Sequence, residues 1–239
     1  MRSEWNVGRS APIQIITVGP FGVSVGLSLQ ELLPHVDVSE YSGAALKREP
    51  EWPAGRMYIL ASWRPVPRLI ESLNVMCHAI RTPLLPAIVD GYHLVVGPVI
   101  VPRLSACHSC YERRVRQHHA RQEARAALNA HYDLHPESGP KGHLRIFADL
   151  AAIRLAQLVH KLDRAPKEVA GHVWQLDLLT RQAVSGRAIG VHGCRYCGMQ
   201  RDEQTRSHAL LEAELPFLFE KDEPMTEAEE EAGVMEQFI

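Results

Sequence analysis

The sequence has no apolar stretch long enough to cross a bilayer and no apolar run near its start. A membrane-spanning helix needs about twenty consecutive apolar residues. The nearest candidate, LLPAIVDGYHLVVGPVIVP, is broken by Asp90, His93, glycines and prolines. The opening residues, MRSEWNVGRSAPIQIITVG, carry charges and a proline where the apolar part of a secretory signal would lie. We therefore expect a cytoplasmic protein that does not associate with a membrane.

The sequence also lacks a strong charge of either sign, because its formal net charge is −2. The chain as a whole therefore has no electrostatic attraction to nucleic acid. Arginines between residues 113 and 125 form a basic stripe, but Glu112 and Glu123 interrupt it and no aromatic side chains are interleaved for base stacking. The stripe predicts a solvated helix face or a contact to an acidic protein surface, and we expect no nucleic-acid partner.

Two familiar catalytic and phosphate-binding motifs are missing: the sequence contains no GxxxxGK[ST] and no HExxH. The stretch VGPFGVSVG lies where a dinucleotide or ATP loop belongs, with glycines at Gly19, Gly22 and Gly26. Their spacing is G-x-x-G-x-x-x-G instead of the G-x-G-x-x-G that cradles phosphates, and Pro20 removes one backbone donor. Asp37 or Glu40, in the next expected strand, would be the candidate to meet a ribose. We prefer a tight turn without a ligand over nucleotide binding.

Composition and hydrophobic periodicity indicate an α/β domain. The chain has 239 residues, of which 46% are hydrophobic and 23% charged, as in ordinary globular proteins. Apolar, β-branched runs at 12–19, 36–40 and 56–63 predict strands, and the helical spacing at 20–34 and 66–83 predicts helices between them. This alternation predicts a parallel, Rossmann-type sheet with right-handed crossovers.

The second half of the chain has a different pattern. We expect a fourth and a fifth strand within 83–102, turning at DGYH, a basic helical stretch at 111–132 and an apolar helix at 144–163. Two antiparallel strands are expected within 172–193. The domain division that follows is a Rossmann-type domain over residues 1–200 and an acidic C-terminal extension over residues 201–239.

Cysteine is sparse, yet four of the five cysteines form two CxxC pairs, Cys107 with Cys110 and Cys194 with Cys197. Two residues between cysteines let a tight turn direct both sulfurs at one metal, and two such turns complete a tetrahedral structural zinc site. The pairs lie too far apart for a local ribbon, so the site would join distant parts of the chain. A redox dithiol stays open for the first pair, because CHSC precedes a helical stretch. Three further residues are predicted to have other roles: His108 and His192 are surface bystanders that could replace a thiol, and Cys77 is buried on an apolar helix face.

Taken together, these residues resemble the ThiF/MoeB activating-enzyme fold, and more narrowly the ThiF-like subunit of cyclodehydratases that make thiazole- and oxazole-modified peptides. The resemblance rests on ITVGPFGVSVGLSLQELL, on TPLLPAIVDGYHLVVGPVIVPRLSACHSCYERR and on VWQLDLLTRQ…GVHGCRYCG, in that order. It implies that Cys107, Cys110, Cys194 and Cys197 are the structural zinc ligands. It also implies a Rossmann-like ThiF/MoeB-type parallel sheet with a small C-terminal antiparallel element.

The resemblance further implies a non-catalytic subunit that presents a ribosomal precursor peptide to a YcaO-type partner, which uses ATP to activate the amide. ATP is then not expected on this chain. Family members usually begin with a winged-helix module that binds the leader peptide, and no such module precedes the first strand here. We therefore expect leader capture by a separate protein or by another surface. The alternative is an active adenylyltransferase of the ThiF/MoeB type.

Two expectations concern assembly. We expect a homodimer, and the alanine-rich helix face with Ala148, Ala151 and Ala152 is the candidate contact, although an intrachain core explains that face equally well. The acidic tail ends on apolar residues, so we expect it to dock on a partner, with the YcaO subunit as the leading candidate and the basic stretch after Cys110 as an intramolecular alternative. The alanine-rich helix face that is the candidate dimer contact also includes Leu155, Leu158 and Val159.

Overall fold

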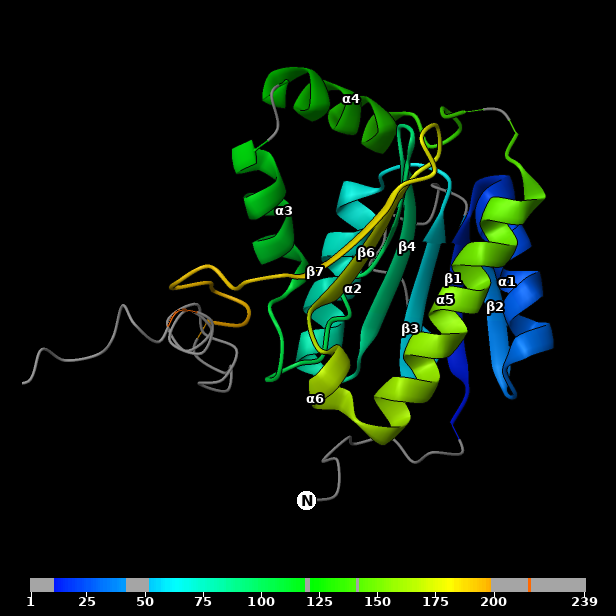
Figure 1. Ribbon diagram of the computed structural model, residues 1–239, viewed down its shortest axis with the longest axis vertical. Coiled ribbons are helices and arrows are strands. Elements are labelled where there is room, and N and C mark those ends of the chain that lie inside the picture. The colour runs from blue at the N-terminus through cyan, green and yellow to red at the C-terminus, as the bar shows by residue number, and fades with distance from the viewer. Residues whose placement is uncertain (1–10, 42–51, 119–120, 141, 199–214, 216–239) are drawn as a thin grey trace, which may run out of the picture.

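The structure is a computed structural model that describes residues 11–41, 52–118, 121–140, 142–198 and 215. These residues form a mixed α/β fold around a seven-stranded sheet in the order β2-β1-β3-β4-β5-β6-β7 (Figure 1). The elements in chain order are β1 (Ile13–Val18), α1 (Gly19–Leu32), β2 (Val36–Glu40), β3 (Met57–Ser62), α2 (Pro67–Ala79), β4 (Leu84–Asp90), β5 (His93–Val96), α3 (His108–His118), α4 (Gln122–Leu134), α5 (Arg145–Arg164), α6 (Pro166–Val169), β6 (His172–Asp177) and β7 (Ala183–Arg187).

The sheet has a parallel half and an antiparallel half. Strands β2, β1, β3 and β4 run parallel, in register from Ile13↔Val36 and Ile13↔Met57 onwards. Strands β5, β6 and β7 continue the same sheet as antiparallel neighbours. The parallel α/β unit and the turn between β4 and β5 are confirmed. The two C-terminal strands extend this sheet and do not form a separate small element.

Helices cover both faces of the parallel half because its strands are apolar on both faces. Ile13 and Ile15 of β1 pack into the core beneath α1 and α5. Ile16 and Val18 of the same strand belong to a second core beneath α2. This alternation is the two-residue period of a strand. In Figure 1, α1 and α5 lie on one side of the sheet and α2 on the other.

The basic stretch at 111–132 was predicted as one helical segment, and this prediction is wrong. The structure divides it into α3 and α4, which lie at an angle to each other, with α4 across one end of the sheet (Figure 1). Two long-range contacts fix α4 in this direction. Arg125 pairs with Asp90 at the end of β4, 2.5 Å away, and Arg64 donates to the carbonyl of Tyr132, 3.3 Å away.

The alanine-rich face of α5 is buried inside the chain. Ala148, Ala151 and Ala152 have no exposed surface, and they pack in the same core as Phe21 and Leu29 of α1. This face is therefore an intrachain core and cannot be the contact of a homodimer. A homodimer stays a prediction and would need another surface. The rest of the predicted face, Leu155, Leu158 and Val159, is buried in the same core.

None of the helices among the described residues combines the length and apolar character needed to span a membrane. The acidic extension, predicted as residues 201–239, lies outside the described residues except for Leu215.

Candidate metal centre

The two CxxC pairs lie on two tight turns that face each other. Cys107 directly precedes α3 and Cys110 lies in the first turn of that helix, where the Cys110 amide donates to the Cys107 carbonyl over 3.1 Å. Cys194 and Cys197 follow β7, and the Gly198 amide donates to the Cys194 carbonyl over 2.8 Å. A backbone hydrogen bond therefore closes each pair, and each side presents two sulfurs.

The four sulfur atoms have the spacing of a tetrahedral thiolate site. Sγ of Cys107 lies 3.7 Å from that of Cys110 and 3.6 Å from that of Cys194. Sγ of Cys110 lies 3.6 Å from that of Cys197, and all four atoms lie within 4.8 Å of one another. Sulfurs at 2.3 Å from a central zinc ion would be about 3.8 Å apart. The cluster therefore fits a metal ion held by four cysteines.

Because the four thiols lie close together away from water, the ionisation of each one affects the pKa of the others. All four cysteines are buried. Hydrogen bonds from the thiols of Cys107 and Cys197 hold the pKa of Cys110 far below its usual range. The hydrogen bond to Cys110 in turn raises the pKa of Cys107. A thiolate at this place is also stabilised by the Val191 amide, which donates to the Cys110 sulfur over 3.3 Å. Such a donor is the outer contact that commonly supports a thiolate ligand.

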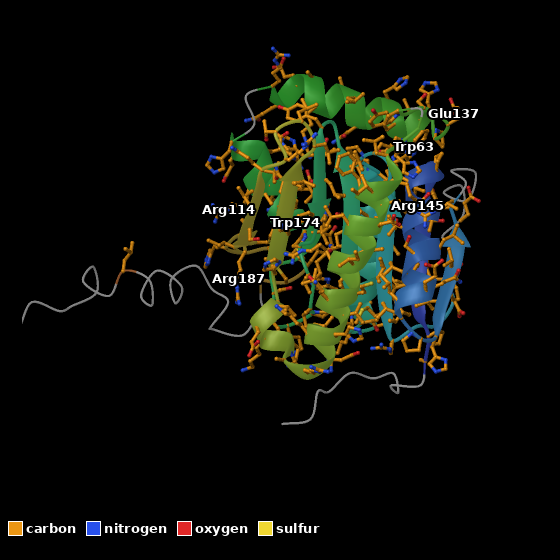
Figure 2. The ribbon with its side chains drawn as sticks, turned by 45° about the vertical axis from the view of Figure 1, so that its right-hand side comes forward. Trp63, Arg114, Glu137, Arg145, Trp174 and Arg187 are labelled. Carbon is orange, nitrogen blue, oxygen red and sulfur yellow. The ribbon has the colours of Figure 1, made fainter. Side chains whose placement is uncertain are left out.

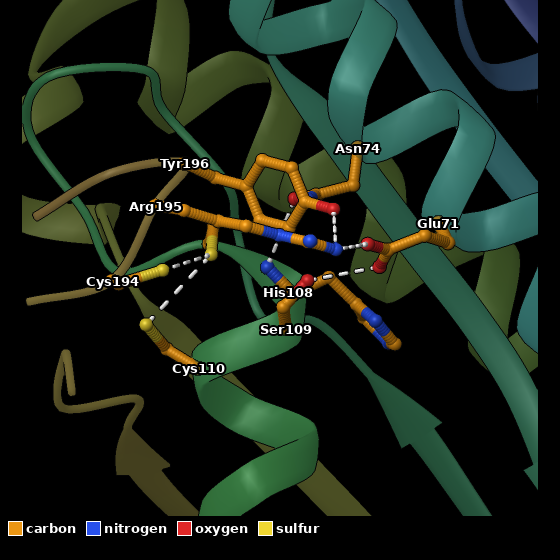
Figure 3. A network of polar contacts seen from close by, with 9 residues as sticks. Glu71, Asn74, His108, Ser109, Cys110, Cys194, Arg195 and Tyr196 are labelled. Carbon is orange, nitrogen blue, oxygen red and sulfur yellow. Dashed lines mark hydrogen bonds and ion pairs between the residues drawn. The ribbon is translucent and has the colours of Figure 1, made fainter.

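A polar network attaches both turns to α2, and sequence analysis missed it (Figure 3). The His108 amide donates to the side-chain oxygen of Asn74 over 3.0 Å, and the Ser109 hydroxyl donates to Glu71 over 2.9 Å. Glu71 also lies 3.9 Å from Arg195, which comes from the second turn. Asn74 is buried on an otherwise apolar helix face. A polar residue in that position was the one sequence signal that could have revealed this support.

The other candidates from the sequence do not join the cluster. Cys77 is buried in α2 in the separate core beneath that helix, where burial raises the pKa of its thiol. The prediction that His108 lies at the surface is wrong: it is buried beside the cluster, and burial lowers its pKa, so the imidazole is held neutral. His192 is exposed. The metal-type group among the described residues consists of the four predicted cysteines and contains no histidine.

The glycines Gly19, Gly22 and Gly26, for which we preferred a tight turn without a ligand over a phosphate loop, belong to a helix. Helix α1 begins at Gly19 itself, so Gly22 and Gly26 lie within its first two turns. A Cβ atom on Gly22 would stand 2.3 Å from the carbonyl oxygen of Ala61 in β3. One on Gly26 would stand 3.1 Å from side chains of Thr17 and Val38. These two glycines therefore allow α1 to lie close against the sheet.

An aromatic ring covers the start of α1. Gly19 has a φ of +71°, and a Cβ there would lie 2.6 Å from the indole of Trp63, which follows β3. On its other side the indole faces Gly139, where a Cβ would lie 2.9 Å away. Figure 2 shows Trp63 at the end of the molecule where Glu137 and α4 lie. The start of a helix is where phosphates bind in nucleotide-binding folds, and here the chain itself occupies the space.

The candidates for a ribose contact lie apart in the sheet. Asp37 stands near the amino end of β2, opposite Gln14 of β1, whose side chain donates to it over 3.2 Å. Glu40 is at the carboxyl end of β2, opposite Thr17 and closer to the start of α1. The register therefore leaves Glu40 and not Asp37 at the edge of the sheet where nucleotides bind in this type of fold.

Comparisons with solved structures found several proteins that share the fold. The scan against family models and the search of curated proteins both found no match. The structure is similar to that of the heterocyclase TruD, with a TM-score of 0.56 and 18% identity over 79% of this chain. It is also similar to a heterocyclase in complex with substrate and cofactor, with a TM-score of 0.56 and 18% identity over 79% of this chain.

A further match is the Escherichia coli protein MccB. The microcin C7 biosynthetic enzyme MccB in complex with N-formylated MccA gives a TM-score of 0.54 and 16% identity, covering 79% of this chain and 68% of that one. The chain spans about a quarter of the heterocyclases it matches, 27% of TruD and 25% of the substrate complex. At these identities the comparisons establish a shared fold, so the chain has the fold of MccB and of one part of TruD.

Proposed function

We propose that this chain is a non-catalytic, ThiF-like zinc scaffold subunit of a cyclodehydratase that forms thiazoles or oxazoles. In this role it presents a ribosomal precursor peptide to a YcaO-type partner that uses ATP. The observation that carries the proposal is the position of Trp63, whose indole lies against Gly19 at the start of α1. An adenylating relative would need that space for nucleotide phosphates. The likeness to one part of the heterocyclase TruD supports the same role.

The metal in this proposal is zinc, bound for stability. Four buried thiolates are the donor set of structural zinc sites, and the set is complete, so it leaves no open position for a substrate. The site joins the start of α3 to the segment after β7, two parts of the chain that are 87 residues apart at Cys110 and Cys197. Metal bound there would hold the second half of the domain against α2 through Asn74 and Glu71.

The second candidate function is an active adenylyltransferase of the ThiF/MoeB type. It is favoured by the match to MccB, because the chain covers 68% of that enzyme and only a small part of the heterocyclases. In this case ATP would have to displace Trp63 from Gly19. The two functions therefore differ in whether this chain alone reacts with ATP.

ATP–pyrophosphate exchange on the purified full chain separates them. The scaffold proposal predicts no exchange above a blank without protein, either alone or with the precursor peptide, and the same result for Trp63→Ala. Exchange that depends on the precursor peptide would overturn the scaffold proposal and establish the adenylyltransferase. Leu27→Ala, at an exposed position on α1, is the matched control for the effects of mutation and purification on the assay.

A further inference from the structure

Strand β7 is an open edge of the sheet. It is last in the strand order, and within the described part of the chain it pairs with β6 alone. All five of its residues are exposed, and its sequence, AVSGR, contains a single charged residue and no proline. Natural sheets commonly protect an edge with charges, proline or a covering element. The opposite edge strand, β2, carries two carboxylates in its five residues. The edge at β7 is therefore the one available for pairing with a further strand.

The register shows which backbone groups of β7 face away from β6. In an antiparallel pair, directly opposed residues alternate between pairs that exchange hydrogen bonds and pairs that do not. The Ala188 amide donates to the Gly171 carbonyl over 2.8 Å, and the Asp177 amide donates to the Gln182 carbonyl over 2.9 Å. The even-numbered residues of β7 therefore bond to β6. The backbone groups that face the open side belong to Ala183, Ser185 and Arg187.

The two faces of β7 differ in chemistry. Ser185 lies opposite Trp174, which packs in the core beneath α1 and α5. Opposed residues of two strands share a face, so Ser185 and Arg187 face the same side of the sheet as α5. Val184, which is 63% exposed, faces the other side. A strand added beside β7 would therefore have a polar, basic neighbour on one face and an apolar neighbour on the other.

The side of the sheet toward α5 is basic next to β7. Arg154 of α5 covers the ring of Trp174, with its guanidinium carbon 5.1 Å from the ring centre. Trp174 and Arg187 both lie on the antiparallel half of the sheet (Figure 2). The pKa of His172 is lowered by burial and by the positive charges of Arg154, Arg187 and Lys161. Three positive charges therefore lie around one point of this face.

No carboxylate neutralises these charges in the described part of the chain. None of the ion pairs found there includes Arg154, Lys161 or Arg187. Arg187 donates to Glu168 of α6 over 2.6 Å, but the acceptor is the backbone carbonyl and not the carboxylate. The charge of this face therefore favours an acidic partner.

We propose that β7 binds an extended segment of another protein as an additional strand, and that this segment has acidic side chains on its face toward α5. Strand addition of this kind takes its affinity from the backbone and its specificity from alternate side chains. Neighbouring strands lie about 4.8 Å apart, so the acids would stand beside Arg187. A second copy of this chain fits less well, because pairing β7 with itself would bring two basic faces together. This inference does not depend on the proposed function, because a scaffold and an adenylyltransferase would have the same edge.

The test uses the full-length protein and a short synthetic peptide with glutamate at every second position and valine between. The same peptide with lysine in place of glutamate is the matched control. Fluorescence anisotropy should show that the glutamate peptide binds roughly tenfold or more tightly than the lysine peptide. Amide exchange followed by NMR should show that the glutamate peptide slows exchange about tenfold or more at the outward amides. These are the amides of Ala183, Ser185 and Arg187.

Substitutions at one position of β7 test whether a strand is added. Ser185→Pro removes an outward amide and leaves the hydrogen bonds to β6 in place, as proline can at a sheet edge. We expect it to weaken binding of the glutamate peptide about tenfold or more. Ser185→Thr keeps the amide and should bind the peptide as the wild type does. Circular dichroism and metal content establish that each variant is folded.

A second pair of substitutions tests the charge. Arg187→Gln should weaken binding of the glutamate peptide severalfold at low salt and less at high salt. Arg81→Gln, at an exposed arginine just after α2 on the other face of the sheet, should leave binding unchanged.

Several results would overturn the proposal. The glutamate peptide may not fail to bind or to protect the three amides, and Ser185→Pro must not bind it as tightly as the wild type. Equal binding of the lysine peptide, or protection of the same amides by a single-stranded DNA oligonucleotide, would also reject an acidic strand. Slower exchange of these amides at higher protein concentration without peptide would show that a second copy of this chain covers the edge instead.

Discussion

At the scale of single residues, the metal centre depends on backbone geometry as much as on sulfur. A Cβ on Gly198 would lie 2.6 Å from the carbonyl oxygen of Cys194, and Gly193 has a φ of +66°. Both positions favour glycine because a side chain would disturb the turn that brings Cys194 and Cys197 together. The glycines that frame the second CxxC pair are therefore part of the centre.

Loss of one sulfur should remove the metal and weaken the whole domain. We expect Cys194→Ser to lower the metal content from one ion per chain to near zero. The free energy of unfolding should fall by about 4 kcal/mol or more, because metal binding contributes directly to folding. Elemental analysis and urea denaturation measure the two effects.

Cys77→Ser is the matched control for that substitution. It places a hydroxyl in an apolar core and should cost roughly 1–3 kcal/mol while leaving the metal content unchanged. A chelator should destabilise the wild type and Cys77→Ser but leave Cys194→Ser unaffected. Wild-type protein that is purified without a chelator and contains no metal would contradict the zinc site.

The residues of the centre differ in how far the sequence predicts them. The CxxC spacing indicates the four ligands because both turns are local. Their support by Asn74 and Glu71 is not local: Asn74 accepts from His108, which is 34 residues away. Periodicity places Asn74 on α2 but says nothing about which loop will lie against it.

At the scale of elements, the distance between α1 and the sheet is set by glycine. The Gly22 position faces a backbone oxygen of β3, which cannot move without disturbing the strand. The Gly26 position faces the ends of side chains, which can shift. Gly186 of β7 has no atom within 4 Å of its Cβ position. These three sites therefore form a series of decreasing constraint.

Alanine substitutions should follow this order. We expect Gly22→Ala to lower the free energy of unfolding by roughly 1–3 kcal/mol through overpacking. Gly26→Ala should lower it by less, and Gly186→Ala should stay within about 0.5 kcal/mol of the wild type. Thermal and urea denaturation give the three values. A Gly22→Ala protein as stable as Gly186→Ala would show that α1 does not lie as close to β3 as described.

The hydrophobic periodicity of the sequence predicts most of the helices and strands. It fails where contacts between distant parts of the chain determine the structure. Helices α1, α2 and α5 have apolar faces in their sequences, and all three form. The break between α3 and α4 has only a weak local signal, the pair His118 and His119, because the flanking arginine, glutamine and alanine favour a helix. It arises from the contacts that Arg125 and Arg64 make to distant parts of the chain. For α5 the sequence reveals an apolar face but not that α1 covers it.

At the scale of the whole molecule, Trp63 and the cysteine centre lie at different places in the fold, and our scaffold proposal draws on both. Trp63 covers the start of α1 at the carboxyl ends of β1 and β3. The cysteine centre joins α3 and the segment after β7 to α2. Metal binding would therefore build a rigid surface, while the position used for nucleotides in related folds is filled. In fold, the chain corresponds to 27% of the length of the heterocyclase TruD.

Dehydration of a precursor peptide, followed by mass spectrometry, tests this account most directly. The reaction contains ATP, a candidate YcaO-type partner and a candidate precursor peptide, with or without this chain. We predict loss of water from the peptide only when the YcaO protein is present, with a rate at least tenfold higher when this chain is added, and none with this chain alone. A peptide that is adenylated or dehydrated by this chain without the YcaO protein, or a YcaO reaction that this chain leaves unchanged, would contradict the account.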